Sequence, residues 1–314
     1  MIGNPVDFTS GAPTLGNLTV TWVHGSASPR RRTDPPLQVH AYDPHTFVLR
    51  ESKDVSFEAP FIYLLLGNER ALLVDTGATA DPALCPLRAT VDRLVNGWLA
   101  EHSRSSYELV VAHTHSHGDH TAGDPQFSDR PDTRIVGRAP EAVREFFGFG
   151  GDLDEVRRFD LGGRSLELIR IPGHHPASIA LYDRWTGWLL TGDTVYPGRL
   201  YVFDGPAYRG SLDRLVRFAS TRSVTYLLGG HLEMTDRAGR DYPYGSRYQP
   251  RERPLPMARE RLIAVRDAAV SVADRPGAHA FEDFVLFSLP STGAVLRQLL
   301  RGKLWNLRWR LGLA

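Results

Sequence analysis

Cysteine and lysine are nearly absent from this chain of 314 residues. The single cysteine, Cys85, allows no disulfide within the chain, and we interpret it as a buried, unreactive thiol. Lysine occurs only at Lys53 and Lys303, so arginine carries nearly all of the positive charge. Acidic residues balance it to a formal net charge of +1, which leaves no overall field that would attract nucleic acid.

Long apolar runs are also missing. No stretch approaches the roughly 20 apolar residues that span a bilayer, and the first residues do not combine a basic segment with an apolar run, so we expect a cytoplasmic protein without a secretory signal. A chain with 42% hydrophobic residues can bury a large core. We expect an N-terminal extension (1–59), a core (60–235), and a substrate-pocket loop with C-terminal helices (236–314) that complete the same domain.

Apolar runs of strand length alternate with segments of helical spacing along the chain. We predict strands at 18–23, 61–67, 71–77, 107–113, 133–137, 165–173, 177–183, 187–193 and 224–231. We predict helices at 81–101, 140–148, 211–220 and 258–274, whereas 281–289 suits a strand or an ordered loop. Hairpins within each half favour an α/β sandwich over a doubly wound parallel sheet.

Residue types that bind metals are densest in the segment HTHSHGDH, residues 113–120, which follows the apolar run 107–113. Imidazoles and carboxylates are zinc ligands, and a catalytic zinc ion usually has three protein ligands and one position for water. Gly118 gives the turn the backbone freedom that lets Asp119 and His120 point differently from His115 and His117. The segment therefore predicts a catalytic metal site at the end of a strand.

The spacing His115-x-His117-x-Asp119-His120 resembles the signature of metallo-β-lactamase-fold hydrolases. Further landmarks of that family follow in its order: Asp75-Thr76-Gly77, Pro172-Gly173-His174, Thr191-Gly192-Asp193 and Gly230-His231. The resemblance covers roughly residues 60–235. It implies an α/β fold, an αββα sandwich of the metallo-β-lactamase type with N- and C-terminal extensions, and points to the glyoxalase II-like and lactonase-like branches.

The resemblance implies two metal ions per chain. One ion would be held by His115, His117 and His174. The other would be held by Asp119, His120 and His231, and Asp193 would bridge the two. This nitrogen and oxygen donor set suits Zn²⁺, with iron or manganese as alternatives. A water shared by two such ions would become a hydroxide nucleophile near neutral pH, which Asp119 and Asp193 would help to position as catalytic residues.

Three residues near these landmarks have less direct roles. The Pro-Gly-His register favours His174 over His175 as the ligand, which leaves His175 to line the pocket. His113 lies outside the ligand register and suits a supporting or packing role. We expect Asp75 to accept a hydrogen bond from a ligand imidazole and so to fix its tautomer; a turn-forming role is the alternative.

Tyr196, three residues after Asp193, resembles a tyrosine that contacts substrate in N-acyl-homoserine lactone lactonases. Its hydroxyl would stabilise an oxyanion or deliver a proton as a catalytic group, and simple packing of the ring is the alternative. Glu233, two residues after His231, either supports the ligands from behind or lies at the surface.

Glyoxalase II-like thioesterases usually carry a basic C-terminal patch for glutathione. The candidates here are Arg240, Arg247, Arg251 and Arg253, although a solvated loop is the favoured interpretation in so arginine-rich a chain. Three tyrosines of the same segment are candidates for a pocket wall: Tyr242, Tyr244 and Tyr248.

Leucines recur at helical spacing in the C-terminal tail: Leu296, Leu299, Leu300, Leu304, Leu307 and Leu311. Five basic residues accompany them, and no acidic ones. With Trp305 and Trp309, such a helix suits an anionic membrane surface. We favour packing on the chain's own domain or on a second copy, so a homodimer is an open alternative.

The function that this pattern favours is a dinuclear zinc hydrolase that cleaves an ester, thioester or lactone-type bond of a small molecule. The alternatives are a mononuclear iron enzyme similar to persulfide dioxygenases, a β-lactam hydrolase, and a non-enzymatic protein with a structural metal site. Seven ligands argue against the last, because structural zinc sites usually have four protein ligands and are closed.

Overall fold

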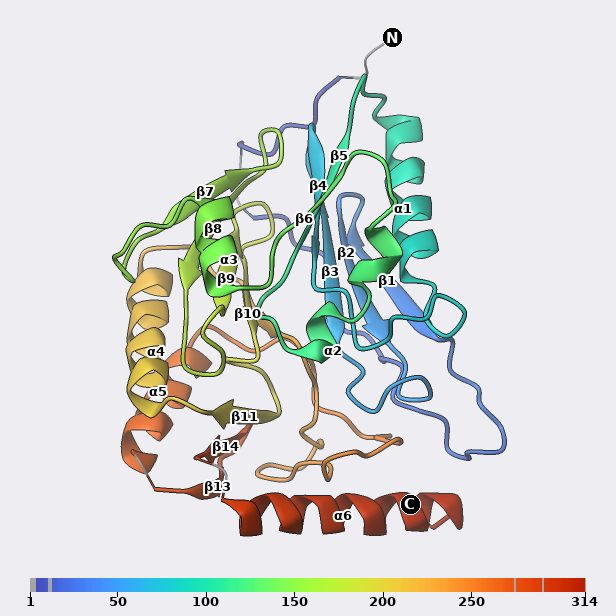
Figure 1. Ribbon diagram of the computed structural model, residues 1–314, viewed down its shortest axis with the longest axis vertical. Coiled ribbons are helices and arrows are strands. Elements are labelled where there is room, and N and C mark those ends of the chain that lie inside the picture. Colours follow the sequence, from blue (N-terminus) through green and yellow to red (C-terminus); the bar gives the residue numbers. More distant parts are fainter. Residues whose placement is uncertain (1–3, 11–12, 274, 290, 314) are drawn as a thin grey trace.

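Two β-sheets lie face to face in the middle of the protein, with helices on both outer sides (Figure 1). The structure is a computed structural model that describes residues 4–10, 13–273, 275–289 and 291–313. The first sheet has the strand order β1-β2-β3-β4-β5-β6, and the second has the order β12-β10-β9-β8-β7. A small third sheet, β11-β14-β13, lies near one end of the sandwich.

The strands of the first sheet are β1 (Leu37–Asp43), β2 (Thr46–Glu51), β3 (Phe61–Leu66), β4 (Arg70–Val74), β5 (Glu108–Ala112) and β6 (Thr133–Ile135). Those of the second are β7 (Arg157–Asp160), β8 (Ser165–Arg170), β9 (Ile179–Asp183), β10 (Trp188–Gly192) and β12 (Tyr226–Gly229). Those of the third are β11 (Arg199–Val202), β13 (Gly277–Ala280) and β14 (Val285–Ser288).

The helices are α1 (Leu87–Glu101), α2 (Gly118–Thr121), the 3₁₀ turn η1 (Asp124–Phe127), α3 (Pro140–Phe147), α4 (Gly205–Ser220), α5 (Arg261–Val272) and α6 (Thr292–Arg310). In Figure 1, α1 lies on the outer side of the first sheet, and α4 and α5 lie on the outer side of the second. The order of layers is therefore helix, sheet, sheet, helix, as the resemblance implied.

Three apolar clusters hold these layers together. The cluster between the sheets contains side chains of both, such as Leu72 of β4 and Leu190 of β10. A second cluster joins the outer face of the first sheet to α1, and a third joins the second sheet to α4 and α5. Strand β3 is apolar throughout because both of its faces are buried. Tyr63 and Leu65 face the central cluster, while Leu64 faces α1.

Most of the predicted elements are present, but the strand predicted at 18–23 is wrong. That segment forms no backbone ladder with a neighbour. Side chains of β1 bind its backbone instead: Gln38 accepts from the amide of Val23 at 2.6 Å and donates to the carbonyl of Thr21 at 3.1 Å. Leu18 and Trp22 are still buried in the core. The alternating pattern therefore reflects the burial of these side chains and not the pairing of a strand.

The short strands β7, β11 and β13 were not predicted, because they lack an apolar run. The strands β1 and β2, which lie in the predicted N-terminal extension, are part of the first sheet. The division of the chain at residues 59 and 235 stays a prediction.

Helix α6 lies across one end of the sandwich (Figure 1). Within the described part of the chain, no helix combines the length and apolar character that crossing a bilayer requires. The cytoplasmic location stays a prediction. Cys85 is 2% exposed, and burial raises the pKa of its thiol to about 12, which fits the unreactive thiol that we expected.

Candidate metal centre

The candidate ligands all follow strands of the two sheets. His115 and His117 come after β5, Asp119 and His120 lie on α2, and His174 lies between β8 and β9. Asp193 and His231 come just after β10 and β12. Because β10 pairs in parallel with β12, and β4 with β5, the carboxyl ends of these strands meet at one edge of each sheet. The sandwich therefore brings the seven candidate ligands to one place.

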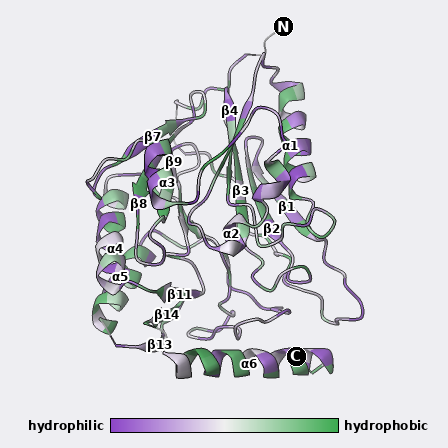
Figure 2. Ribbon diagram, viewed as in Figure 1, coloured by the Kyte–Doolittle hydropathy of each residue, from purple (hydrophilic) through white to green (hydrophobic). Residues whose placement is uncertain are grey.

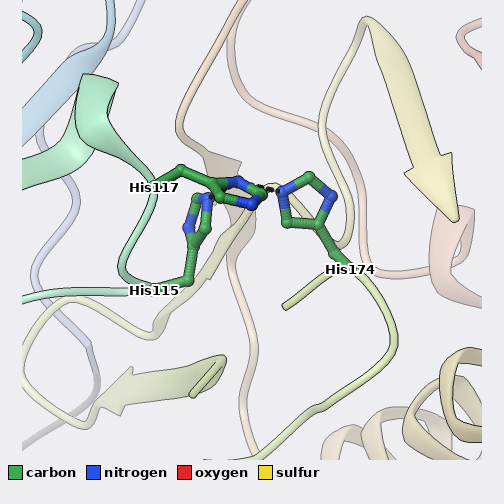
Figure 3. A group of neighbouring side chains, drawn as sticks. All are labelled: His115, His117 and His174. Atoms are coloured by element: carbon green, nitrogen blue, oxygen red, sulfur yellow. Dashed lines mark hydrogen bonds between the residues drawn. The ribbon is translucent and has the colours of Figure 1, made fainter. Parts of the chain in front are cut away.

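Three imidazoles form the first group: His115, His117 and His174 (Figure 3). Nδ1 of His117 lies 3.0 Å from Nε2 of His115 and 3.0 Å from Nε2 of His174. Burial and the neighbouring imidazoles lower the pKa of His115 well below its ordinary value, and burial lowers the pKa values of His117 and His174 too. The three rings are therefore neutral at pH 7, which is the form that binds a metal ion.

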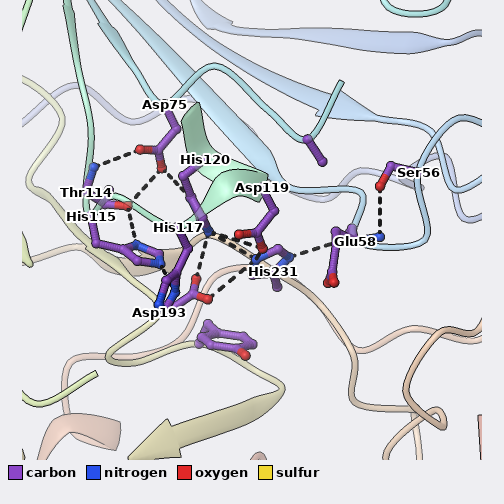
Figure 4. A network of polar contacts seen from close by, with 12 residues as sticks. Ser56, Glu58, Asp75, Thr114, His115, His117, Asp119, His120, Asp193 and His231 are labelled. Carbon is purple, nitrogen blue, oxygen red and sulfur yellow. Dashed lines mark hydrogen bonds and ion pairs between the residues drawn. The ribbon is translucent and has the colours of Figure 1, made fainter. Parts of the chain in front are cut away.

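Two imidazoles and two carboxylates form the second group: Asp119, His120, Asp193 and His231 (Figure 4). Nε2 of His120 and Nε2 of His231 are 3.2 Å apart. Oδ2 of Asp119 lies 3.2 Å from Nε2 of His231 and 3.8 Å from Nε2 of His120. The ligand atoms of the group lie within 4.8 Å of one another, a separation that suits one cation.

Asp193 belongs to the second group and also lies close to the first. Its Oδ2 is 3.7 Å from Nε2 of His174 in the first group and 3.5 Å from Nε2 of His231 in the second. Its Oδ1 is 3.4 Å from Nε2 of His120. One carboxylate therefore contacts both groups, which is the arrangement that a bridging ligand requires.

Hydrogen bonds on the outer side of the rings fix their tautomers. Nδ1 of His120 donates to Oδ2 of Asp75 at 2.9 Å, and Nδ1 of His174 donates to the carbonyl of Tyr201 at 2.9 Å. Nδ1 of His231 donates to the carbonyl of Glu58 at 3.1 Å. In a neutral ring the lone pair of Nε2 then points to the centre, as metal ligation requires.

Asp75 makes the contact that the sequence predicted, and it also holds the loop that carries His115. It accepts from the amide of Thr114 at 2.7 Å and from the hydroxyl of Thr114 at 2.9 Å, as well as from His120. Its backbone has a φ of 69°, a left-handed conformation that a non-glycine residue adopts only where its surroundings impose it.

The carboxylates of the second group are ionised. Burial alone would raise the pKa of Asp193, but His231 and His120 lower it to about 2. Burial would lower the pKa of His231, but Asp193 and Asp119 raise it to about 9. Without a cation, protons on these imidazoles thus compensate the carboxylates, and a metal ion would take their place.

Two further observations test whether these residues fit metal ions. Oδ1 of Asp193 is buried and has no hydrogen-bond partner among the described residues, although buried acceptors are normally satisfied. A Cβ atom on Gly230 would lie 2.6 Å from that oxygen and 2.6 Å from Cε1 of His120. The chain keeps this space free beside the ligands, and both observations fit a bound cation.

A cavity of about 360 Å³ opens beside the two groups. Its polar side consists of five candidate ligands together with Glu58, Glu233 and Gln298; the five are His117, Asp119, His174, Asp193 and His231. Aromatic and aliphatic side chains form much of the rest: Tyr196, Tyr201, Phe203, Tyr244, Phe287, Val295 and Leu299. Most of the candidate ligands therefore face a space that is large enough for a small molecule with an apolar part.

Sequence reasoning missed Glu58 as a residue of the cavity. It lies in a loop between β2 and β3, and its carbonyl oxygen accepts from His231. Burial raises the pKa of its carboxyl group to about 7. The loop carries no apolar run or metal-ligand motif, so only the fold reveals this position.

His113 and His175 lie outside the two ligand groups, as the register predicted. Nε2 of His113 lies 2.8 Å from Oδ1 of Asp124, which also accepts from Thr76 at 2.8 Å. His113 therefore has a structural role. The ring centroid of His175 is 4.9 Å from that of His117, which places it beside the first group.

Tyr196 lines the cavity beside the second ligand group. Its ring is 2% exposed and lies 5.8 Å from the ring of His231, centroid to centroid. Its hydroxyl donates to the carbonyl of Arg199 at 2.5 Å, and burial raises the pKa of Tyr196 well above its ordinary value. This hydrogen bond favours the packing alternative, whereas the catalytic role of Tyr196 stays a prediction.

The arginines proposed for glutathione do not line the cavity. Arg253 pairs with Asp283 at 2.6 Å, and Arg247 donates to the backbone of Lys53 and Val55. Arg240 and Arg251 are exposed. Glu233 is buried and pairs with Arg199. Of the three tyrosines, Tyr244 lines the cavity, while Tyr242 and Tyr248 do not.

Comparison with known families agrees with this geometry. The family model described as "Metallo-beta-lactamase superfamily" matches residues 56–231, which is more than half of the chain. The chain belongs to the metallo-β-lactamase superfamily.

Two relatives and one solved structure show the extent of the similarity. The "Hydroxyacylglutathione hydrolase" of Anaeromyxobacter dehalogenans (strain 2CP-C) is 31% identical over 138 residues, 43% of this chain and 46% of that protein. The protein of the same name from Rhodospirillum rubrum is 30% identical over 213 residues, 66% of this chain and 74% of that protein. DIM-1 metallo-β-lactamase exposed to ceftazidime has a TM-score of 0.51 at 14% identity and covers 76% of this chain and 99% of its own.

These similarities have different weight. The chain spans about half to two thirds of the length of several of the curated relatives it matches. At 14% identity, the likeness to the β-lactamase shows the fold alone.

Proposed function

We propose that this protein is a hydrolase that uses two divalent metal ions to cleave an ester, thioester or lactone-type bond of a small molecule. The observation that carries the proposal is the contact of Asp193 with both ligand groups, at 3.7 Å from His174 and 3.5 Å from His231. The adjoining cavity supports an enzyme rather than a structural metal site, because structural sites are closed.

Zinc is the metal that we propose, since the donors are imidazoles and carboxylates without a thiolate. When bound, a pair of such ions lowers the pKa of a shared water and stabilises negative charge on a carbonyl oxygen. The second ligand group favours two ions over the single iron of the dioxygenase alternative, because Asp119, His120 and His231 gather around a position of their own.

The chain's own residues prepare the site for this chemistry. Asp75 and the carbonyls of Tyr201 and Glu58 orient the imidazoles through their Nδ1 hydrogens. Asp119 and Asp193 supply the negative charge that retains cations and, in this proposal, help to position the attacking water. Phe203, Phe287 and the other apolar residues of the cavity wall would hold the apolar part of the substrate and exclude bulk water.

The names of the relatives favour a thioester among the candidate bonds, because hydroxyacylglutathione hydrolases are named for one. The cavity does not favour glutathione itself as the leaving group. Its lining contains Glu58 and Glu233 but no lysine or arginine, so it offers no basic side chain to the carboxylates of that tripeptide. We therefore propose an uncharged or weakly charged acyl substrate.

Hydrolysis of acyl thioesters, lactones, esters, β-lactams and phosphodiesters by the zinc-loaded protein tests the proposal. We expect turnover of at least one carbonyl substrate. In Asp119→Ala the turnover rate should fall at least about 100-fold, because a metal pair that lacks one of its ligands stabilises the charge of the transition state less well. Asp267→Ala, at an exposed position on α5, is the control and should retain full activity. Equal turnover in wild type and Asp119→Ala on every substrate would refute the proposal.

A further inference from the structure

One face of α6 is fixed to the body of the protein. The indole Nε1 of Trp309 donates to the carbonyl of Ser26 at 2.8 Å, and that of Trp305 donates to the carbonyl of Tyr248 at 3.0 Å. The side chain of Asn306 donates to the carbonyl of Gly245 at 2.8 Å. Both tryptophans therefore hold the helix in place on the body of the protein, rather than insert into a bilayer.

The opposite face of α6 carries a stripe of leucines that no described residue covers. The five side chains are each more than half exposed: Leu296 55%, Leu300 51%, Leu304 63%, Leu307 53% and Leu311 65%. At 3.6 residues per turn they fall on one side of the helix, opposite the buried Ala294, Gln298, Gly302 and Trp309. We call these five residues the leucine stripe.

Basic side chains border the leucine stripe on both sides. By the same helical geometry, Lys303 and Arg310 lie along one border, and Arg297, Arg301 and Arg308 lie along the other. All five are exposed, although Arg301 also pairs with Asp241 at 3.1 Å, and the sequence from Thr292 to Leu313 contains no acidic residue. Figure 2 shows this alternation of hydrophobic and hydrophilic residues along α6.

We propose that the leucine stripe docks on an anionic lipid surface. An exposed apolar face between rows of lysine and arginine matches a bilayer interface, where leucines enter the acyl region and the basic groups meet phosphate. A second copy of the chain is a poorer occupant. Pairing α6 with its own copy would bring the basic borders of both helices together, and the helix has no acidic residue to compensate them.

The position of α6 gives this docking a consequence for the active site. Val295, Gln298 and Leu299 of α6 form part of the cavity wall, so a helix seated on lipid would bring the cavity next to the bilayer. A substrate with a long acyl chain would then reach the metal centre from the membrane. This consequence rests on the proposed function, whereas the lipid docking does not.

Co-sedimentation of the full chain with vesicles tests the docking without any assay of hydrolysis. We expect the protein to bind vesicles of phosphatidylcholine with 30% phosphatidylglycerol by weight at least about tenfold more strongly than vesicles of phosphatidylcholine alone, because each basic residue near an anionic surface adds to binding. Raising the salt concentration should weaken this binding, because salt screens the charges.

Two sets of variants locate the surface. Leu300→Asp, Leu304→Asp and Leu307→Asp together should lower binding at least about tenfold. The matched control is Leu15→Asp, Leu84→Asp and Val270→Asp together, at positions of comparable exposure away from α6, and it should bind as wild type does. Circular dichroism should show the same helix content in both sets.

Two results would overturn the proposal. One is equal binding by wild type and the leucine-stripe variant, or no binding by either. The other is a concentration-dependent dimer in sedimentation velocity that the leucine-stripe substitutions abolish while vesicle binding is absent, which would make this face an interface between two copies. A protein that binds vesicles but hydrolyses nothing would support the docking and contradict only the proposed function.

Discussion

At the scale of single residues, the ligands were predictable because short motifs carried them. The spacing from His115 to His120 and the later Pro-Gly-His, Gly-Asp and Gly-His motifs named seven residues, and the fold brings all seven together. Their roles as ligands stay a prediction until metal is measured. Tyr196 and Glu58 could not be assigned from sequence, because the role of one depends on the carbonyl of Arg199 and the place of the other on a loop without a motif.

The protonation of His231 predicts how metal affinity depends on pH. In the metal-free protein its pKa is raised to about 9, so the ring is protonated at pH 7 and a cation must displace that proton. Affinity should therefore rise at least about tenfold per pH unit up to about pH 9, because at least the proton of His231 is displaced. Competition with a chromophoric chelator between pH 6.5 and 9.5, corrected for the chelator's own protonation, measures this. An affinity that is constant or falls with pH would contradict it.

At the scale of elements, apolar periodicity located the long strands and helices but not their partners. The hairpin of β3 and β4, and the helices α1, α4 and α5, lie where the pattern placed them. The tail was predicted to pack on its own domain or on a second copy, and its leucines were the apolar residues that the pattern offered for this contact. It packs instead through Gly302, Gln298 and the tryptophans, because Gly302 lets the helix approach the backbone of Tyr244.

Gly302 predicts how tightly α6 is held. A Cβ atom there would lie 1.9 Å from the carbonyl oxygen of Tyr244, whereas one on Gly293 would meet nothing within 4 Å. Gly302→Ala should therefore lower the free energy of unfolding by about 1–3 kcal/mol, and the fluorescence of Trp305 and Trp309 should shift toward that of exposed indole. Gly293→Ala is the control and should be neutral or stabilising by up to about 1 kcal/mol. If both variants behaved alike, the close approach would be refuted.

At the scale of the whole molecule, the site depends on the two sheets keeping their relative position. Arg164, between β7 and β8, is buried and pairs with Asp183 of β9 at 2.6 Å. It also donates to the carbonyls of His45 at 2.7 Å and Leu66 at 3.1 Å in the first sheet. This guanidinium thus joins both sheets across the central cluster, a link that no local motif in the sequence indicated.

Removing Arg164 should destabilise the sandwich strongly. In Arg164→Leu, Asp183 would remain buried without its partner, so we expect the free energy of unfolding to fall by about 3–5 kcal/mol in denaturant titrations. Arg217→Leu breaks an exposed pair, with Asp154, whose side chains are 62% and 63% exposed. It should cost less than about 1 kcal/mol. A loss of that small size in both variants would show that Arg164 does not join the sheets.

The metal content of the purified chain tests the central claim most directly. After loading with zinc and dialysis, elemental mass spectrometry should find two zinc ions per chain in the wild type and at most one in His231→Ala, which removes a ligand of the second group. One ion or none in the wild type, or two ions retained in the variant, would contradict a centre built from both groups.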